Sequence, residues 1–332
     1  MHYIMKKLKV GVIGIGYLGR FHAQKYAALP EVEIVGLVDI VLPRAKEWAD
    51  KLRTIAFSDY RKLLGAVDAV SVVVPTDLHH RVAKDFLQSG SDILLEKPIS
   101  TSLWEAEDLI ATARENGRIL QVGHLERFNP AILAVQGKIR APLFIESHRL
   151  TPFRGRGTEV DVVLDLMIHD LDIILSFVRS EVKHIHAVGV PVLTEKVDIA
   201  NARMQFEGGC VANVTASRIS LEDQRRIRVF QPETYLTVDY AARRVDLYHR
   251  VPSCSGGKTQ ICLEQVKVAP GDSLEGEIRS FVNSSTNRTT PLVTGEDGKK
   301  ALTVALEINE QIQANIEKIP SIISFYEKTI DD

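Results

Sequence analysis

The sequence predicts an α/β fold in two domains: an N-terminal doubly wound parallel sheet, and a C-terminal α+β domain with a large, open, mainly antiparallel sheet. At 332 residues the chain exceeds one ordinary domain. Strand-like and helix-like segments alternate up to about Gly123, as in a parallel sheet with helices on both faces. From Val182 onward, strand-like runs follow one another with short turns, which indicates antiparallel pairing. We therefore predict domains at residues 1–123 and 124–332.

The expected elements follow this pattern in order. In the first domain we expect strands at residues 8–13, 33–38, 54–57, 68–74, 92–95 and 119–122, helices at 17–29, 43–52, 78–88 and 104–116, and a helical turn at 60–64. In the second we expect helices at residues 129–139, 161–178, 273–282 and 298–316, and strands at 143–150, 182–190, 200–206, 210–219, 226–230, 235–239, 245–248 and 261–268. Few helices remain to cover both faces of that second sheet, and residues 200–206 and 210–219 alternate apolar and small side chains. We therefore expect self-association, as a homodimer or homotetramer.

The first functional signal is a glycine triplet with the spacing G-x-G-x-x-G, directly after an apolar strand-like run. Gly14 permits a tight turn, Gly16 lets the backbone approach a pyrophosphate, and Gly19 lets helix and strand pack closely. The N-terminus of the following helix offers free N–H groups and partial positive charge to phosphates. The predicted phosphate-binding turn consists of Gly14, Ile15, Gly16, Tyr17, Leu18 and Gly19.

An acid follows at the end of the next predicted strand. Asp39 lies 20 residues after Gly19, where a carboxylate accepts hydrogen bonds from ribose hydroxyls. A glycine-rich turn without a ligand would not explain strand, triplet, helix, strand and acid in register. We expect NAD as the cofactor, because Asp39 would repel the 2′-phosphate of NADP. Arg44 is near enough in sequence to keep NADP possible.

Composition excludes several classes of protein. The hydrophobic fraction of 45% and charged fraction of 25% are those of a soluble globular chain. A net charge of −2 gives no electrostatic reason to expect nucleic acid or a membrane as partner. The cysteines, Cys210, Cys254 and Cys262, are odd in number and lack C-x-x-C spacing, which fits a reducing compartment. With no segment of signal-peptide or membrane-spanning character, we expect a cytoplasmic protein.

Polar residues follow the later strands of the first domain, at the carboxyl ends where ligands bind in a doubly wound fold. Thr76 and His79 follow the fourth strand, Glu96 and Lys97 the fifth, and His124 and Arg127 the sixth. Lys97 is the strongest candidate, since a lysine desolvated beside a cofactor can transfer a proton near neutral pH. A solvated lysine ahead of a proline turn is the alternative. His79 and its neighbour His80 have the alternative of capping the next helix.

A second group lies on the helix predicted at residues 161–178. Asp165, His169 and Asp172 are spaced i, i+4 and i+7, so they project from one face, beside an apolar stripe. A solvated helix face explains the same pattern. We expect no metal here, because the group has a single histidine and no cysteine.

Four motifs together give the chain a family resemblance: G-I-G-Y-L-G at Gly14, T-D-L-H at Thr76, E-K-P at Glu96 and D-L-M-I-H-D-L-D at Asp165. The chain resembles the glucose–fructose oxidoreductase, inositol dehydrogenase and rhizopine-catabolism (Gfo/Idh/MocA) family over nearly its whole length. The resemblance implies an N-terminal Rossmann domain and an NAD(P)-dependent oxidoreductase acting on a sugar, cyclitol or sugar nucleotide. It also implies that Lys97, Asp165 and His169 are the catalytic residues.

One departure points to a branch of that family. Where many relatives carry glycines before the catalytic aspartate, this chain has E-V-D-V-V-L from Glu159. With G-H-L-E-R-F-N-P from Gly123, it resembles a branch associated with nucleotide-sugar oxidation, including 3-dehydrogenases of UDP-N-acetylglucosamine. Other carbonyl chemistry on a cyclitol or simple sugar is one alternative, and a non-catalytic dinucleotide sensor is another.

The expected reaction is reversible hydride transfer between nicotinamide and a secondary ring hydroxyl. We assign the base to His169, whose unperturbed pKa lies near neutrality, and alkoxide stabilisation to Lys97; the reverse assignment stays open. Asp165 would orient His169 or the sugar. The residues expected to contact substrate are His124, Arg127, Arg154, Arg156 and Asp172, the two loop arginines as ligands of a substrate phosphate. A solvated basic loop is the alternative for Arg154 and Arg156.

Overall fold

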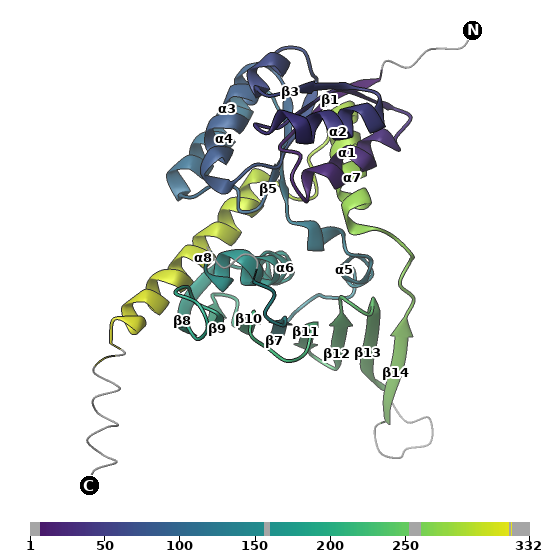
Figure 1. The fold of residues 1–332 in the computed structure, drawn as a ribbon. Coiled ribbons are helices and arrows are strands. Elements are labelled where there is room, and N and C mark those ends of the chain that lie inside the picture. Colours follow the sequence, from purple (N-terminus) through teal and green to yellow (C-terminus); the bar gives the residue numbers. More distant parts are fainter. Residues whose placement is uncertain (1–6, 156–159, 252–259, 319, 321–332) are drawn as a thin grey trace. The chain divides into compact units, whose positions relative to one another are not determined.

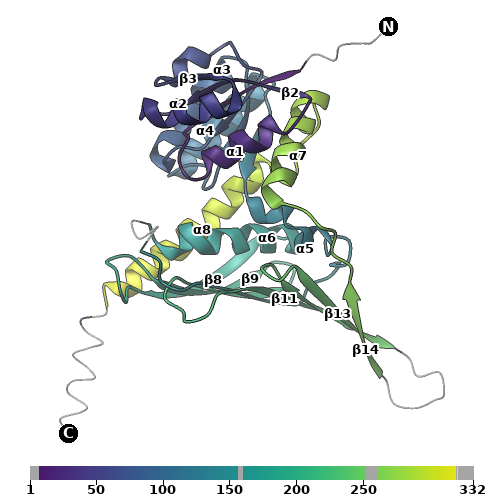
Figure 2. The ribbon, with the colours of Figure 1, turned by 45° about the vertical axis from the view of Figure 1, so that its right-hand side comes forward.

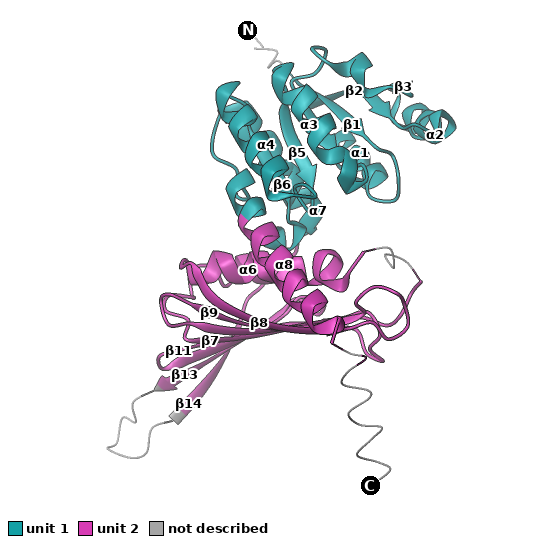
Figure 3. Ribbon diagram, turned by 90° about the vertical axis from the view of Figure 1, so that its left-hand side faces the viewer, with its two compact units in different colours: residues 1–129, 271–299 teal, residues 130–270, 300–332 magenta. Residues whose placement is uncertain are grey.

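The computed structural model describes residues 7–155, 160–251, 260–318 and 320, which fall into two compact units (Figure 3). The first comprises Met1–Asn129 and Gly271–Lys299, and the second Pro130–Pro270 and Lys300–Asp332. These two units differ in two places from the predicted domains, residues 1–123 and 124–332. Residues 124–129 stay with the first unit, and a later segment returns to it.

The first unit is built on a six-stranded parallel sheet with the strand order β3-β2-β1-β4-β5-β6. The strands are β1 (Leu8–Ile13), β2 (Val32–Val38), β3 (Ile55–Phe57), β4 (Ala69–Val72), β5 (Asp92–Glu96) and β6 (Leu120–Gly123). The helices are α1 (Gly19–Ala27), α2 (Leu42–Leu52), α3 (His79–Gln88), α4 (Leu103–Glu115) and α7 (Ser273–Asn287), with 3-10 turns η1 (Tyr60–Leu63), η2 (Thr76–Leu78) and η3 (Leu125–Phe128). Helices lie on both faces of the sheet, as predicted (Figure 1). The strand order reverses beside β1, which makes its carboxyl end the expected ligand crevice.

Helix α7 joins the first unit because its apolar residues belong to that unit's core. Ile278 and Phe281 are fully buried with Tyr26 of α1 and Val10 of β1. The helix begins at a cap, where the Asp272 side chain accepts a hydrogen bond from the Glu275 N–H. It runs five residues beyond the predicted end at residue 282.

The second unit is built on an eight-stranded sheet with the order β14-β13-β12-β11-β7-β10-β9-β8. The strands are β7 (Phe144–Leu150), β8 (Val182–Val190), β9 (Ile199–Phe206), β10 (Val211–Ser217), β11 (Gln224–Gln231), β12 (Thr234–Asp239), β13 (Arg244–Val251) and β14 (Gln260–Val266). The pairing of β7 with β10 is parallel and the other pairings are antiparallel. Figure 2 shows α5 (Pro130–Leu133) and α6 (Ile168–Val178) on one face of this sheet, with no described helix on the other. The open, mainly antiparallel sheet is therefore confirmed.

One argument for self-association was wrong: the apolar residues that alternate along β9 do not need a partner chain to cover them. Ala200, Ala202 and Met204 of β9 are buried in the unit's own core, so they need no partner chain. The alternate residues of β9, such as Asn201 and Arg203, are exposed and polar. An alternating pattern shows that one face is covered without showing what covers it.

Two helices of the second unit depart from prediction. The helix expected at residues 129–139 ends at Leu133, because the chain continues in tighter turns, with Val135 N bonded to Ile132 O and Lys138 N to Val135 O. The helix expected at residues 161–178 begins as a π-helical turn, η4 (Val163–Met167), before α6. A π turn holds an extra residue, so side chains before it are out of phase with those after it.

Helix α8 (Gly295–Ile316) starts three residues earlier than predicted. Among the described residues, no helix combines the length and the apolar content that crossing a membrane requires.

Candidate active site

The glycine turn after β1 has the shape that a pyrophosphate requires. Gly14 has φ +91°, and a side chain there would collide with the carbonyl oxygen of Val73. A Cβ at Gly19 would overlap the carbonyl oxygen of Gly14, so helix and turn touch only because both are glycine. A Cβ at Gly16 would meet no atom within 4 Å. The open side of the turn is therefore at Gly16, where the motif requires a phosphate to approach.

Asp39 lies beside this turn, at the end of β2. Its carboxylate accepts hydrogen bonds from Ile15 N at 3.0 Å and from Val41 N at 2.8 Å, and only 6% of the residue is exposed. The Arg44 guanidinium lies 3.2 Å from the same carboxylate, with 48% of its side chain exposed. The acid is thus fixed at the turn, with the partly exposed Arg44 guanidinium paired to it.

The loop after β4 is tied to the loop after β5 by His79. The His79 ring lies with Nδ1 2.8 Å from Pro98 O and Nε2 2.9 Å from Val74 O. Burial lowers the pKa of His79, and a neutral imidazole has one N–H, so one of these contacts donates at a time. Neither His79 nor His80 caps α3, so the capping alternative is wrong. His80 contacts Asp108 at 2.6 Å instead.

Lys97 follows β5 and is half-buried. Its N–H donates to Glu96 Oε2 at 3.3 Å. Burial, helped by the neighbouring charges of Lys97 and Arg127, lowers the pKa of His124 to about 3. His124 is therefore a neutral, buried imidazole beside the positive charge of Lys97. Lys97 itself is only partly exposed, and its catalytic role stays a prediction.

Arg127 is also buried, and its guanidinium donates to Leu292 O at 3.3 Å. Thr76 opens the 3-10 turn after β4 and is half-buried. Contacts of these residues and of His79 and His124 with ligands stay predictions.

A group of three residues beside Lys97 joins the predicted Glu96, which is half-buried, to two buried residues that were not predicted, His22 and Glu277. One ligand-type atom each from His22, Glu96 and Glu277 lies within 4.8 Å of the others. These donor types can hold a cation. No local signal could have linked them, since they lie on α1, β5 and α7, far apart in sequence.

In the second unit, the π turn and α6 carry the other predicted group. Asp165 is half-buried on η4, and His169 is half-buried on α6. Asp172 is 2% exposed, so the three do not form the evenly solvated face that the alternative reading requires. π turns occur often at functional sites, and this one contains Asp165 and ends two residues before His169.

Helix α6 is held to the sheet by a buried ion pair that we did not predict. Asp170 is fully buried and accepts hydrogen bonds from Arg149 Nε at 2.5 Å and Ser147 Oγ at 2.9 Å. Asp170 is adjacent to His169, so this pair sets the helix rotation that presents His169.

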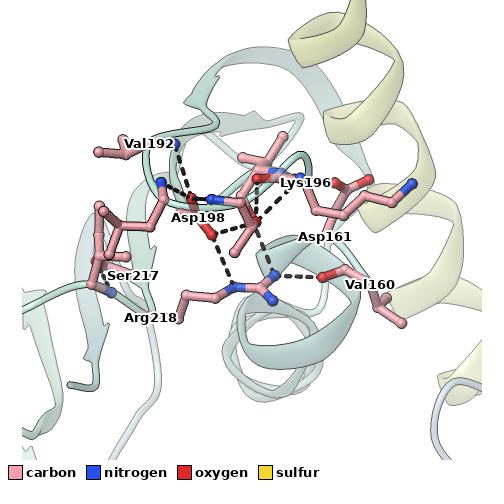
Figure 4. Close-up of polar contacts among 11 residues, drawn as sticks. Val160, Asp161, Val192, Lys196, Asp198, Ser217 and Arg218 are labelled. Atoms are coloured by element: carbon pink, nitrogen blue, oxygen red, sulfur yellow. Dashed lines mark hydrogen bonds and ion pairs between the residues drawn. The ribbon is translucent and has the colours of Figure 1, made fainter. Parts of the chain in front are cut away.

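The segment before the π turn is held by the Asp198 cluster, shown in Figure 4 and comprising Asp198, Arg218 and the loop around them. Asp198 accepts hydrogen bonds from the N–H groups of residues 192–194 at 2.7–2.9 Å. Arg218 pairs with Asp198 at 3.8 Å and donates to Val160 O and Val197 O. Burial would raise the pKa of Asp198, but the three N–H groups lower it below its usual range.

The two loop arginines differ in what the structure shows. Arg154 is 56% exposed at its side chain and pairs with Asp223 at 3.0 Å. Arg156 lies outside the described residues. The proposed phosphate contacts of both stay predictions.

Comparison with known proteins identifies the family. Residues 8–124 match the oxidoreductase family with an NAD-binding Rossmann fold, and residues 132–234 match the GFO/IDH/MocA C-terminal domain. The chain belongs to this family. The resemblance read from the four motifs is thus confirmed.

Family members of known activity include sugar and cyclitol dehydrogenases. The chain is 39% identical to UDP-N-acetylglucosamine 3-dehydrogenase of Acidithiobacillus ferrooxidans, over 95% of this chain and 100% of that protein. A solved structure of UDP-N-acetylglucosamine 3-dehydrogenase from the same organism has a TM-score of 0.87 and 40% identity, covering 93% of this chain and 99% of that one. Myo-inositol 2-dehydrogenase of Thermotoga maritima is 24% identical, over 92% of this chain and 96% of that protein.

As a member of the Gfo/Idh/MocA family, the chain is an oxidoreductase with an NAD-binding domain. The first unit brings together the glycine turn and Asp39, and carries Lys97 at the carboxyl edge of the same sheet. The second unit carries Asp165, His169 and Asp172 on one helical segment.

Proposed function

We propose that this protein is an NAD-dependent dehydrogenase of a nucleotide sugar, oxidising the 3-hydroxyl of UDP-N-acetylglucosamine or a close analogue. The observation that carries the substrate is the 39% identity to a UDP-N-acetylglucosamine 3-dehydrogenase along that protein's whole length. The redox chemistry is supported by the open glycine turn at Gly16 with Asp39 fixed beside it.

NAD supplies the hydride acceptor when bound. The chain's own residues must remove the hydroxyl proton as the hydride leaves the ring carbon, since the carbonyl forms only when both depart. We assign the proton to His169, because a histidine can accept and release it near neutral pH. Lys97 donates a hydrogen bond to the same oxygen and stabilises its developing negative charge. Asp165, four residues before His169, orients the imidazole or the sugar.

The preference for NAD over NADP rests on Asp39. Its two oxygens are held by Ile15 N and Val41 N, so the carboxylate cannot turn away from a 2′-phosphate. Arg44 already pairs with Asp39, which weakens the repulsion and makes NADP a slower cofactor that is not excluded.

A homo-oligomer is proposed from the uncovered face of the eight-stranded sheet. Phe144, Phe230, Tyr235 and Tyr248 stack in sequence across β7, β11, β12 and β13, with ring centroids 5.7, 5.2 and 4.3 Å apart. The next residue in register, Leu263 of β14, is 53% exposed. This aromatic stripe is an apolar surface that a second copy of the chain would cover. The two described cysteines, Cys210 and Cys262, are unpaired, which supports a place in the reducing cytoplasm.

A substrate panel tests the proposed function. NADH formation is followed with UDP-N-acetylglucosamine, myo-inositol and glucose at equal concentration. We expect the nucleotide sugar to give the highest kcat/KM. Preference for myo-inositol would shift the function to the cyclitol dehydrogenases represented by the Thermotoga maritima relative. No turnover with any substrate, together with tight NADH binding, would favour a dinucleotide sensor.

Variants test the assigned residues. Lys97→Ala and His169→Ala should each lower kcat by roughly 10²–10⁴, with NADH affinity within about twofold of wild type. Lys62→Ala and His184→Ala, which alter exposed residues of the same types, serve as matched controls and should retain full turnover. The rate at high pH separates the two role assignments. If Lys97 is the base, His169→Ala keeps the basic limb of the pH profile and Lys97→Ala loses it.

A further inference from the structure

A connected polar network lies at the carboxyl end of β5, next to Lys97. Tyr26 Oη lies 2.8 Å from Ser71 Oγ, Ser71 Oγ lies 3.2 Å from His22 Nδ1, and His22 Nε2 lies 3.1 Å from Glu96 Oε1. Tyr26, His22 and Ser71 are fully buried, and 13% of the Glu96 side chain is exposed. The network therefore runs from the core of the first unit to the residue before Lys97.

The protons of this network point in one direction. Burial raises the pKa of Tyr26 far above its usual value, so its hydroxyl is protonated. If Tyr26 donates to Ser71, then Ser71 donates to His22 Nδ1, and the N–H at Nε2 donates to Glu96. The opposite order would leave a bare Nε2 facing a carboxylate, which is repulsive. Glu96 is therefore the accepting end of the network, and its other oxygen accepts from Lys97 N.

Glu277 of α7 brings a second carboxyl group to this place. It is fully buried, and among the described residues neither of its side-chain oxygens has a hydrogen-bond partner. A carboxyl oxygen of Glu277 lies within 4.8 Å of a ring nitrogen of His22 and of a carboxyl oxygen of Glu96. Two ionised carboxylates this close in a buried site repel each other strongly. Burial and the charge of Glu96 raise the pKa of Glu277 well above its usual value.

A proton on Glu277 accounts for the closeness of His22, Glu96 and Glu277 better than a bound metal ion does. Both ring nitrogens of His22 are taken up by Ser71 and Glu96, so the ring has no lone pair left for a metal ion.

The other titratable groups around α7 are engaged elsewhere. Glu275 pairs with Arg279 on the exposed side of the helix, and Lys25 of α1 pairs with Asp272 and Glu275. Arg127 of η3 bonds to a main-chain carbonyl. Glu126 of η3 accepts a hydrogen bond from Asn129. None of these is a partner for the Glu277 carboxyl among the described contacts.

We propose that Glu277 is held as a neutral carboxylic acid and acts as a positioning residue, leaving Glu96 as the one ionised carboxylate that anchors the main chain of Lys97. This rests on the proposed function, in which Lys97 contacts the substrate hydroxyl. An ionised Glu277 would push the Glu96 carboxylate away from its bonds to His22 and Lys97 N. The neutral form preserves both bonds.

The infrared spectrum of the ligand-free protein tests the protonation directly. Wild type at neutral pH should show the carbonyl stretch of a buried, protonated carboxyl group that is missing in Glu277→Gln. Identical spectra would overturn the proposal. Elemental analysis of the same samples should find no divalent ion in stoichiometric amount. A bound metal ion that is lost in Glu277→Gln would also overturn it.

Thermal stability against pH gives a second, independent readout. A carboxyl whose folded pKa is raised contributes no penalty below its unfolded pKa, and costs stability progressively as pH rises toward the folded value. As pH rises from 5 to 9, the Tm of Glu277→Gln should therefore increase relative to that of wild type, by about 2 °C or more. A difference that stays constant with pH would contradict a buried neutral acid.

The positioning role is tested on Lys97 itself. Glu277→Ala leaves the buried space beside Glu96 unfilled and should lower kcat by about 10- to 100-fold with little change in KM. Glu277→Gln should restore most of it, since glutamine fills that space and carries no charge. The NMR signal of ¹³C-methylated Lys97, assigned by its loss in Lys97→Arg, should move in Glu277→Ala and return in Glu277→Gln. This signal needs no turnover, so it decides the proposal even if the proposed substrate is wrong. If Glu277→Ala does not fold, Glu277→Gln alone decides the role. A Glu277→Gln protein whose Lys97 signal is shifted, and whose kcat is lowered as much as in Lys97→Ala, would overturn it.

Discussion

Replacing Asp198 by alanine should destabilise the second unit strongly, because one side chain there satisfies several donors. Its carboxylate accepts from three backbone N–H groups and from Thr194 Oγ1, at 2.7–2.9 Å. It also faces Arg218, whose side chain is 6% exposed. Hydrogen bonds to a charged group are worth about 1.5–3 kcal/mol each, but the loop N–H groups can bind water once the carboxylate is gone. Taking about 1 kcal/mol for each bond, and adding a share for the buried Arg218 charge, we expect a loss of roughly 4–5 kcal/mol.

Urea unfolding followed by circular dichroism measures this loss. The matched control is Asp223→Ala, which removes an exposed aspartate that pairs with Arg154, and should cost no more than about 1 kcal/mol. If Asp198→Ala costs less than about 1.5 kcal/mol, or no more than the control, the Asp198 cluster does not hold the loop as described.

The same variant has a pH signature and a catalytic one. The pKa of Asp198 is lowered in the folded state, so its contribution is present above the unfolded pKa and is lost as pH falls through the folded value. The acid limb of the stability curve should therefore be flatter in Asp198→Ala than in wild type. Arg218 holds Val160 O just before the π turn, so kcat should fall while NADH affinity is unchanged. Loss of NADH affinity instead would show that the variant disturbs the first unit.

Three further predictions concern the cofactor and the oligomer. The kcat/KM for NAD should exceed that for NADP in wild type, and Asp39→Ala should reduce or reverse the ratio, since Arg44 is then free to bind a 2′-phosphate; an unchanged ratio removes Asp39 as the selector. Gly16→Ala should weaken NADH binding and leave the free energy of unfolding within about 0.5 kcal/mol of wild type, whereas Gly19→Ala should also lower it by about 1–3 kcal/mol, because its Cβ overlaps Gly14 O. Equal effects of the two alanines would contradict the turn geometry. Light scattering should give a multiple of 37.0 kDa that falls in Tyr235→Arg, and a wild-type monomer at micromolar concentration would rule out the aromatic stripe as an interface.

Short-range patterns were enough to predict the dinucleotide-binding half. The glycine triplet, the apolar strands and Asp39 act over a few residues, where sterics and side-chain periodicity dominate, so their structure can be read from neighbours in sequence. The same holds for the position of Lys97 at a strand end. The strands of the second half were also predictable, because alternation is a local property.

Two features depended on tertiary structure: what covers each face of the eight-stranded sheet, and which residues distant in sequence lie together. The alternation in β9 predicted a covered face, but it took the fold to show that this chain's own core covers it and that half-buried aromatic rings from Phe144 to Tyr248 stack across neighbouring strands. The cap of α7 and its apolar face are local signals, yet its place in the first unit depends on contacts more than 200 residues away in sequence.

The buried polar groups show the same division most clearly. Glu277 looks like any helical glutamate in the sequence, and only its position near Glu96 and His22 makes its protonation state consequential. Likewise, Asp170 became distinguishable from its neighbour Asp172 only when Arg149 was found 2.5 Å away. Sequence alone determines which residues can ionise; the low dielectric and the partners that decide whether they do are properties of the folded chain.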